Sequence, residues 1–299
     1  MGAAVGRGVA QLRRRQRRDG ALRDFALPPG LSDAWTTAHC AFVLDGVPQA
    51  RAVRRDAARF LHERGCRQGA WGFNDRVEED ADSTAQALLV LAEHGYALPG
   101  AWTDVLLGFQ LPDGGFSTFR APPAGPTTGW QAPHADVTLA ALAAVRRLGL
   151  DPGGAERAER FLARAGGVTT AYWWATPAYA PWAHTRFGIA SDAAAQRALD
   201  LLPSASGPLE IALLGRAAGE ILDAATRREV IVHLLATQQA DGSWPCSPCL
   251  RVTDPALHSS RISAPGQIYR GTRGVFSTAH AVACLVHLGA VAGRNRRSR

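Results

Sequence analysis

The chain has 299 residues, a formal net charge of +7 and a pI near 9.8. The positive charge lies at the two ends: six arginines precede the first acid, Asp19, and four more follow residue 293, so the body carries +7 − 10 = −3. This distribution excludes nucleic-acid binding by the body and predicts basic, disordered tails over residues 1–18 and 292–299. Peripheral contact of these tails with anionic lipid headgroups stays open.

No apolar stretch approaches the ~20 residues of a membrane span, and the arginine-rich start is not followed by an apolar signal core. Five cysteines, an odd number, argue against a disulfide framework. Cys246 and Cys249 form the one close pair, and a zinc site would need further ligands such as His258 and His280. We therefore expect a cytoplasmic protein without a bound metal, in which these cysteines belong to a loop.

A pattern recurs along the chain: a turn rich in Gln or Gly with an aromatic residue, then a polar cap, Thr-Ala and an apolar run. Its four copies span residues 16–44, 68–91, 110–142 and 238–285 and contain Thr37, Thr84, Thr138 and Thr278. Ser, Asp and Thr side chains accept hydrogen bonds from the free amides of a first helical turn. Each copy therefore predicts the start of an apolar helix.

Segments with helical spacing lie between the copies and predict a partner helix for each: residues 51–64, 102–110, 155–165 and 224–238. The interval between Thr138 and Thr278 has room for two more pairs, which we expect to begin near Thr176 and Gly207. About six helical hairpins, with few strand patterns, predict an all-α fold, a closed (α/α)6 toroid over residues 19–291. The alternative is an open solenoid of the same hairpins.

Three segments carry a resemblance to a known family: the turns at 110–116 and 238–244, the run Asp80-Ala-Asp-Ser-Thr-Ala85, and residues 171–179. The turns match the glutamine and tryptophan repeats of the squalene-hopene cyclase and class II terpene cyclase superfamily. The run at 80–85 resembles its Asp-x-Asp-Asp-Thr-Ala acid motif, with Ser83 at the last Asp. Residues 171–179 are similar to a Trp-x-x-Ser-Pro-Tyr-Tyr segment of bacterial class II diterpene cyclases.

The resemblance implies cyclisation of an isoprenoid or another polyene, started by proton transfer from Asp82. Family cyclases usually hold this hydrophobic substrate between two helical domains, whereas this chain resembles the acid-bearing domain alone. A homodimer, a partner chain or an open-ended barrel cavity is therefore expected to close the site. No cofactor is expected, except Mg²⁺ if the substrate is a diphosphate.

Protein prenyltransferase beta subunits share the toroid, but their zinc ligands have no counterpart. The positions that match the Asp-x-Cys pair and the His hold Ala81, Ser83 and Ser277. Because none offers a thiolate or an imidazole, the sequence argues against a zinc-dependent prenyltransferase. The chain also lacks an Asp-Asp-x-x-Asp motif for ionising a diphosphate.

Protonation of an alkene requires a carboxylic acid that stays neutral in a water-poor cavity. Asp82 is the predicted acid. Asp80 is expected to cap the helix, about 200° around it from Asp82, and to bias its protonation, and Ser83 is expected to offer a hydrogen bond. The alternative is that Asp82 is only a cap, as Asp33 and Asp136 hold comparable positions in sister copies.

Aromatic faces stabilise carbocations, and Trp173, Trp174 and Tyr179 lie in the densest aromatic cluster. We predict that they contact substrate, together with Trp35, His39 and Asn74. The alternative is a structural role for Trp173, Trp174 and Tyr179, and for His39 a place in the core with its polar atoms satisfied. The aromatics of the repeat turns, such as Trp71, Phe73, Phe116, Trp130 and Trp244, are expected to be structural.

Two other functions remain open at this stage. One is a non-catalytic toroid that binds a hydrophobic biosynthetic intermediate for a partner enzyme. The other is an acid/base enzyme on a different substrate, since a helical toroid with carboxylates at one end also suits glycoside hydrolysis.

Overall fold

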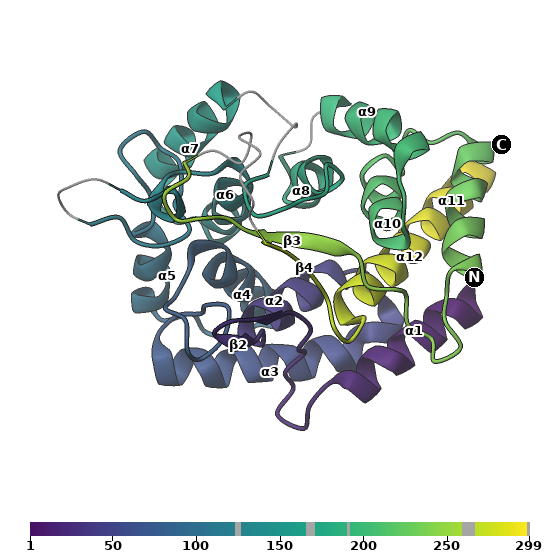
Figure 1. Ribbon diagram of the computed structural model, residues 1–299, viewed down its shortest axis with the longest axis horizontal. Helices are drawn as coiled ribbons and strands as arrows, with labels where there is room; N and C mark the ends of the chain where they lie inside the picture. Colours follow the sequence, from purple (N-terminus) through teal and green to yellow (C-terminus); the bar gives the residue numbers. More distant parts are fainter. Residues whose placement is uncertain (123–126, 166–170, 190–191, 259–266, 298–299) are drawn as a thin grey trace.

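The computed structural model describes residues 1–122, 127–165, 171–189, 192–258 and 267–297. In this part of the chain, six inner helices stand in a ring, and each contacts the next (Figure 1). They are α2 (Ala34–Val43), α4 (Ala81–Glu93), α6 (Ala135–Leu148), α8 (Tyr179–Arg186), α10 (Pro208–Ala217) and α12 (Val275–Arg297). Because α12 contacts α2, the ring is closed, which confirms the toroid and excludes the open solenoid.

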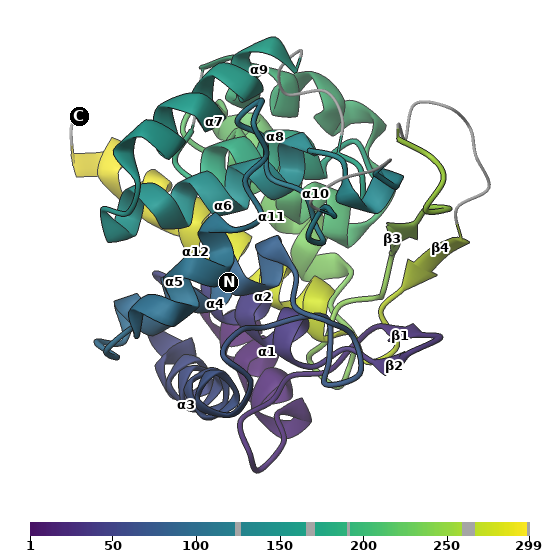
Figure 2. The same cartoon turned by 90° about the vertical axis from the view of Figure 1, so that its left-hand side faces the viewer.

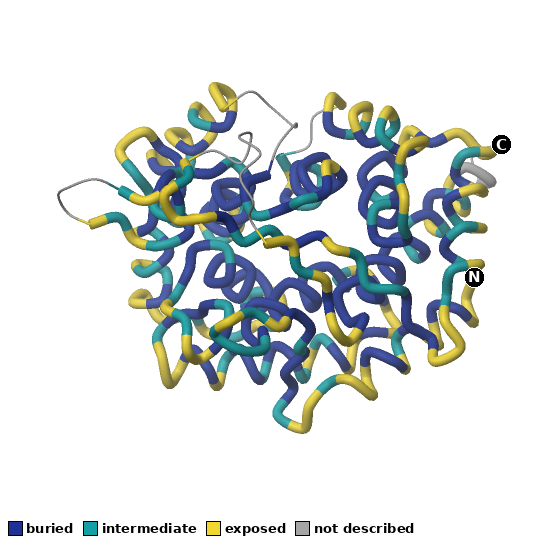
Figure 3. Tube along the Cα trace, in the orientation of Figure 1, coloured by how far each residue is buried: buried dark blue, intermediate teal, exposed yellow. Residues whose placement is uncertain are grey.

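Six outer helices surround this ring. They are α1 (Gly2–Arg15), α3 (Arg51–Gln68), α5 (Gly100–Leu107), α7 (Pro152–Arg164), α9 (Asp192–Leu201) and α11 (Ala224–Ala236). The inner helices are buried almost throughout, whereas the outer helices are exposed along one side (Figure 3). The hydrophobic core therefore lies between the two rings and along the axis of the inner one.

The repeated threonine joins each inner helix to the turn that precedes it. The hydroxyl oxygens of Thr37, Thr138 and Thr278 accept hydrogen bonds of 2.8–3.1 Å from the backbone N–H groups of Leu22, Phe116 and Trp244. Thr84 likewise accepts from the backbone N–H of Trp71, over 3.4 Å, and donates to the carbonyl oxygen of the same residue over 3.1 Å. Threonine recurs because a short hydroxyl side chain satisfies a backbone group that would otherwise be buried without a partner.

The motif Gln-x-x-Asp-Gly binds the start of an outer helix in three of the four copies. The Nε2 groups of Gln16, Gln110 and Gln238 each donate to the carbonyl of the motif's own glycine and to a carbonyl in the first turn of α3, α7 or α1. The glycine is required by this close approach. At Gly242, φ is +89° and a Cβ atom would lie 2.6 Å from the carbonyl oxygen of Arg7.

The tryptophans of two repeat turns hold neighbouring helices together, as expected. Trp71 donates its indole N–H to the carbonyl of Leu61 in α3, over 2.9 Å. Trp244 repeats this contact with Leu234 in α11, over 2.7 Å. Both rings are fully buried, so each contributes apolar packing and a satisfied N–H group.

The prediction of a disordered tail over residues 1–18 is wrong for residues 2–15, which form α1. Ala4, Val5 and Leu12 are buried on one face of this helix, and the arginines lie on the other. The helix packs against α12, and Gln11 donates a hydrogen bond of 2.8 Å to Asp241. The arginine content concealed an amphipathic pattern, and α1 is the outer helix that closes the ring.

The second predicted tail, residues 292–299, is also corrected, because α12 continues to Arg297; residues 298–299 lie outside the described residues. By length and composition, Val275–Arg294 is apolar enough to cross a membrane, contrary to our expectation. Of the residues in the apolar window of this segment, 72% are buried, and α12 is an inner helix of the ring. Its apolar character is therefore explained by core packing.

Two short antiparallel β-hairpins were not predicted. One pairs β1 (Ala26–Leu27) with β2 (Gly30–Leu31), and the other pairs β3 (Pro248–Val252) with β4 (Gln267–Arg270). A bridge between Phe25 and Gly271 joins them, and they lie side by side at one end of the ring (Figure 2). Strands of two to five residues give too short an alternation to be recognised in the sequence.

Substitution of Leu12 tests the structural role of α1. We expect Leu12→Ala to lower the free energy of unfolding by about 2–5 kcal/mol, because the side chain is fully buried. Thermal or urea unfolding followed by circular dichroism measures the change. Arg15→Ala, at an exposed position of the same helix, should change stability by less than about 0.5 kcal/mol. Equal stability of the two variants would indicate that α1 detaches in solution.

Candidate active site

A cavity of about 360 Å³ opens at the end of the ring where the inner helices begin. Its wall is mostly apolar, and among the described residues two carboxylates, Asp80 and Asp82, are the only ionisable groups that line it. The other lining residues are Leu27, Pro28, Pro29, Trp35, Phe73, Val77, Thr118, Phe119, Trp130, Trp173, Trp174, Leu250 and Val252. A concave apolar site with a few convergent polar groups is the usual form of a small-molecule site.

The two β-hairpins of this chain form part of the cavity wall. Pro28 and Pro29 come from the turn between β1 and β2, and Leu250 and Val252 come from β3. A bridge from Trp174 to Leu250 fixes β3 to the aromatic wall. The chain therefore supplies cover of its own over the site. The expected homodimer or partner chain stays an untested prediction.

Asp80 and Asp82 share a hydrogen bond at the first turn of α4. Our expectation that they point about 200° apart is wrong, because Asp80 is the N-cap, with extended backbone angles (φ −129°, ψ 158°). The spacing of 100° per residue applies only inside a helix. The extended N-cap lets the two carboxyl groups meet, and the part of Asp82 that stays exposed lines the cavity.

The hydrogen bonds of the pair give the two acids different surroundings. Asp80 is buried, and its two oxygens accept from the backbone N–H of Ser83 (2.7 Å) and from the Ser83 hydroxyl (2.8 Å). Asp82 accepts a hydrogen bond of 3.2 Å from the indole N–H of Trp35. The predicted partner of the acid, Ser83, therefore contacts Asp80 and acts on Asp82 only through it.

Burial raises the pKa of both carboxyl groups, because it penalises their charged forms. The pKa of Asp80 is raised well above its usual range by burial and then by the neighbouring Asp82. The pKa of Asp82 is raised by burial, while hydrogen bonds from Asp80 and Trp35 oppose the rise. The pair can thus hold protons at a pH where an exposed carboxyl is ionised.

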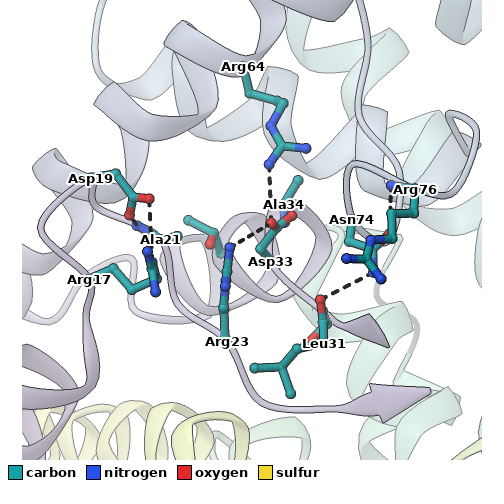
Figure 4. A network of polar contacts seen from close by, with 12 residues as sticks. Arg17, Asp19, Ala21, Arg23, Leu31, Asp33, Ala34, Arg64, Asn74 and Arg76 are labelled. Atoms are coloured by element: carbon teal, nitrogen blue, oxygen red, sulfur yellow. Dashed lines mark hydrogen bonds and ion pairs between the residues drawn. The ribbon is translucent and has the colours of Figure 1, made fainter. Parts of the chain in front are cut away.

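The sister carboxylate Asp33 differs from Asp82 in its partners. Its Oδ2 atom is 3.1 Å from the guanidinium of Arg64 and 3.3 Å from that of Arg23 (Figure 4). Its Oδ1 atom accepts from the N–H of Ala34, as expected of a helix cap. Asp33 is thus engaged in two ion pairs, an arrangement that suits a structural role. The comparison separates a structural cap from a candidate acid.

Four of the predicted substrate contacts fall into two groups. Trp35, Trp173 and Trp174 line the cavity. Tyr179 does not line it, because its ring lies flat against Trp174, with 3.8 Å between ring centroids. Tyr179 therefore supports the aromatic wall from behind.

His39 is fully buried below the cavity and does not line it. Its ring nitrogens lie 2.8 Å from Gln86 Oε1 and 3.0 Å from His280 Nε2. Burial lowers the pKa of His39 to about 3, so the imidazole is neutral. Its position is that of a core residue with satisfied polar atoms, which agrees with the alternative given for it and corrects its prediction as a substrate contact.

Asn74 fixes a loop at the edge of the cavity and is not a lining residue. Its amide nitrogen donates to the carbonyls of Pro29 and Leu31, and its Oδ1 atom accepts from the N–H of Arg76 (Figure 4). It thereby ties the β1–β2 hairpin to the loop before α4. Its predicted contact with a substrate headgroup is replaced by this structural contact.

Sequence reasoning assigned Phe73 and Trp130 to structural turns, but both line the cavity. Trp35 and Phe73 are stacked, with 6.0 Å between ring centroids, and Trp130 lies 5.6 Å from Trp173. Phe73 lies on the loop before α4, and Trp130 lies in a short 3-10 helix, Gly129–Gln131, before α6. Trp71 and Trp244 instead donate to carbonyl groups of the outer helices. No sequence signal separates these two orientations.

Among the described residues, no three His, Cys, Asp or Glu side chains gather into a metal-binding group. Cys246 is half-buried and Cys249 is buried, and both are free thiols. Burial raises the pKa of each thiol, which keeps them protonated and poorly suited to bind a metal.

Comparison with known proteins places this fold. No protein-family model matches the chain, and no curated protein matches it. A crystal structure of a protein from Actinoplanes shares 27% identity with a TM-score of 0.82, over 96% of this chain and 99% of that chain. The α-1,6-mannanase of Salegentibacter is more distant, with 12% identity and a TM-score of 0.55 over 96% of this chain and 99% of that chain.

The type II terpene cyclase MstE from Scytonema shares 22% identity with a TM-score of 0.79. The match covers 97% of this chain and 99% of that chain. Variants of MstE have also been solved with its substrate, geranylgeranyl dihydroxybenzoate, and with its product, merosterolic acid A. Over nearly its full length, this chain has the fold of class II terpene cyclases.

Proposed function

We propose that this protein is a class II terpene cyclase, which cyclises an isoprenoid or another polyene after protonation by Asp82. The observation that carries the proposal is the position of this buried acid pair in an apolar, aromatic cavity. The fold shared with MstE, an enzyme that binds a prenylated substrate, supports the same conclusion.

Asp82 is suited to transfer a proton to a carbon–carbon double bond. The alkene π electrons form a new C–H bond, the O–H bond breaks, and a carbocation and the Asp82 carboxylate result. Trp35 and Asp80 both donate to this carboxylate and stabilise it. Loss of a proton from the final cation restores the proton balance, so the overall reaction is an isomerisation.

The wall of the cavity is suited to the cation that forms. The rings of Trp35 and Trp174 lie 6.1 Å apart, and those of Trp35 and Phe73 lie 6.0 Å apart, all on the cavity. A dry aromatic face stabilises a cation by about 1–2 kcal/mol. The apolar residues from the hairpins limit water, which would otherwise quench the intermediate.

Glycoside hydrolysis is less well supported. The fold of the mannanase is related, but glycosidases need two carboxyl groups about 5 Å or more apart, on either side of the scissile bond. Asp80 and Asp82 instead bind each other. The apolar wall also offers few partners for sugar hydroxyls. A non-catalytic carrier of a hydrophobic intermediate is distinguished by the next experiment.

Substitution of Asp82 tests the proposed acid. We expect Asp82→Asn to lower turnover by at least about 100-fold, because an amide cannot supply the proton. Purified protein is incubated with C15, C20 and C30 polyenes, free, diphosphorylated or attached to an aromatic ring, and products are followed by mass spectrometry.

Asp75→Asn is the matched control, since it removes a carboxylate from an exposed position of the loop before α4. It should keep wild-type turnover. Product formation that survives in Asp82→Asn would exclude Asp82 as the acid. Tight binding of polyenes without any product in the wild type would favour the carrier.

Replacement of Trp35 tests the hydrogen bond to the acid. Trp35→Phe keeps an aromatic ring but removes the N–H group that lowers the pKa of Asp82. The pKa of Asp82 should therefore rise, which makes it a weaker acid that stays protonated to a higher pH. We expect turnover to fall about 10-fold and the alkaline limb of its pH profile to move upward.

Trp173→Phe is the control for loss of an indole donor on the same cavity. Its N–H donates to the hydroxyl of Thr118 over 2.7 Å and not to the acid. It should leave the alkaline limb in place. If both variants shift the alkaline limb by the same amount, the effect of Trp35→Phe comes from a change in cavity shape and not from the lost hydrogen bond to Asp82.

A further inference from the structure

A third carboxylate, Asp136, lies on the inner helix next to that of Asp82 and interacts electrostatically with it. It belongs to the first turn of α6, the inner helix next to α4, and is only 6% exposed. Its Oδ2 atom accepts a hydrogen bond of 3.2 Å from the backbone N–H of Trp173, while its buried Oδ1 atom has no hydrogen-bond partner. A buried carboxylate oxygen without a partner is costly and calls for an explanation.

Asp136 interacts electrostatically with acidic or uncharged groups. They include Asp82 in the first turn of α4, His134 at the N-cap of α6, and Tyr172 and Tyr179, which lie in the loop before α8 and in α8 itself. Burial lowers the pKa of His134 and raises the pKa of both tyrosines, so all three are neutral at pH 7.

Within the described part of the chain Asp136 has no ion pair, which sets it apart from Asp33, the N-cap of α2. Arg64 and Arg23 neutralise Asp33, whereas no Arg or His among the described residues forms an ion pair with Asp136. The free amides at the start of α6 favour a negative charge at this position. No neighbouring cation among the described residues therefore weakens the electrostatic effect of Asp136 on the acid pair.

We propose that Asp136 is a positioning residue whose negative charge keeps the proton on the Asp80–Asp82 pair. The inference rests on the proposed function, because it assigns Asp136 a part in loading the catalytic acid. A carboxylate in a buried site opposes the ionisation of its neighbours, since like charges repel strongly where water is absent. Asp136 does not line the cavity, so it acts through Asp82.

The same residue also connects the acid to the aromatic wall. Its Oδ2 atom holds the backbone of Trp173, whose indole lines the cavity and donates to Thr118. A purely structural role of Asp136 would consist of this hydrogen bond alone. The proposal adds an electrostatic effect, and the two are separated by a substitution that removes the charge but keeps the acceptor for Trp173.

Asp136→Asn makes this separation, because the amide oxygen can still accept from Trp173. Removal of the charge should lower the pKa of Asp82, so the acid loses its proton at a lower pH. We expect the alkaline limb of the kcat/KM profile to move down by about one pH unit, while turnover on the acidic plateau is kept. This direction is opposite to that expected for Trp35→Phe.

Asp136→Glu retains the charge and should keep the limb near its wild-type position. Asp136→Ser is a second neutral variant, to be used if Asp136→Asn does not fold, and melting curves report the fold of each. A limb that stays in place in a folded neutral variant would overturn the proposal and leave Asp136 as a helix cap.

Infrared spectroscopy gives a readout that needs no turnover. The C=O stretch of protonated carboxyl groups, followed from pH 4 to 9, should disappear at lower pH in Asp136→Asn than in the wild type or in Asp136→Glu. A shifted band in a protein that turns over no polyene would support the role of Asp136 and contradict the cyclase. An unshifted band with normal cyclisation would do the reverse.

Discussion

The Gln-x-x-Asp-Gly turn is the contact on which the ring depends. In each of its three copies, the glutamine amide binds the turn and the first turn of an outer helix, at α3, α7 and α1. The aspartate accepts from a backbone N–H two residues later, as Asp241 does from Ser243. The glycine lets the outer helix approach to contact distance. Because the last copy binds α1, the two ends of the chain meet and the inner helices have no open edge.

Closure of the ring decides where the chemistry lies. The inner helices begin at the same end of the ring, so the polar caps that the repeat requires gather around one opening. Free helix amides there can stabilise negative charge. The hairpins add apolar cover to this end, and the cavity that results holds carboxylates in a setting where water is scarce. Because the capping residue is repeated, several polar side chains lie at the end of the ring where the site is found.

The sister carboxylates show how one site differs from its copies. Asp33 is paired with two arginines and stays a structural cap. Asp80 and Asp82 bind each other and have no cation, so burial raises the pKa of both. Asp136 has neither a cation nor a place on the cavity wall. The same residue type therefore has different roles according to its partners. In the proposed cyclisation, Asp82 would be the acid, Asp80 would share its proton, and Asp136 would support the pair electrostatically.

The sequence by itself determined the repeat, the pairing of helices and the segment that carries Asp82, because capping residues and helical periodicity are local properties. Two predictions from the sequence were wrong. The arginines of α1 suggested a disordered tail, although one face of this helix is buried, and Asp80 was placed by helical spacing, although its N-cap backbone is extended. Only the tertiary structure decided that Phe73 and Trp130 line the cavity while His39 and Tyr179 support it. It also decided that Asp33 is neutralised and Asp82 is not. These outcomes depend on contacts between residues tens to hundreds of positions apart, which no local pattern records.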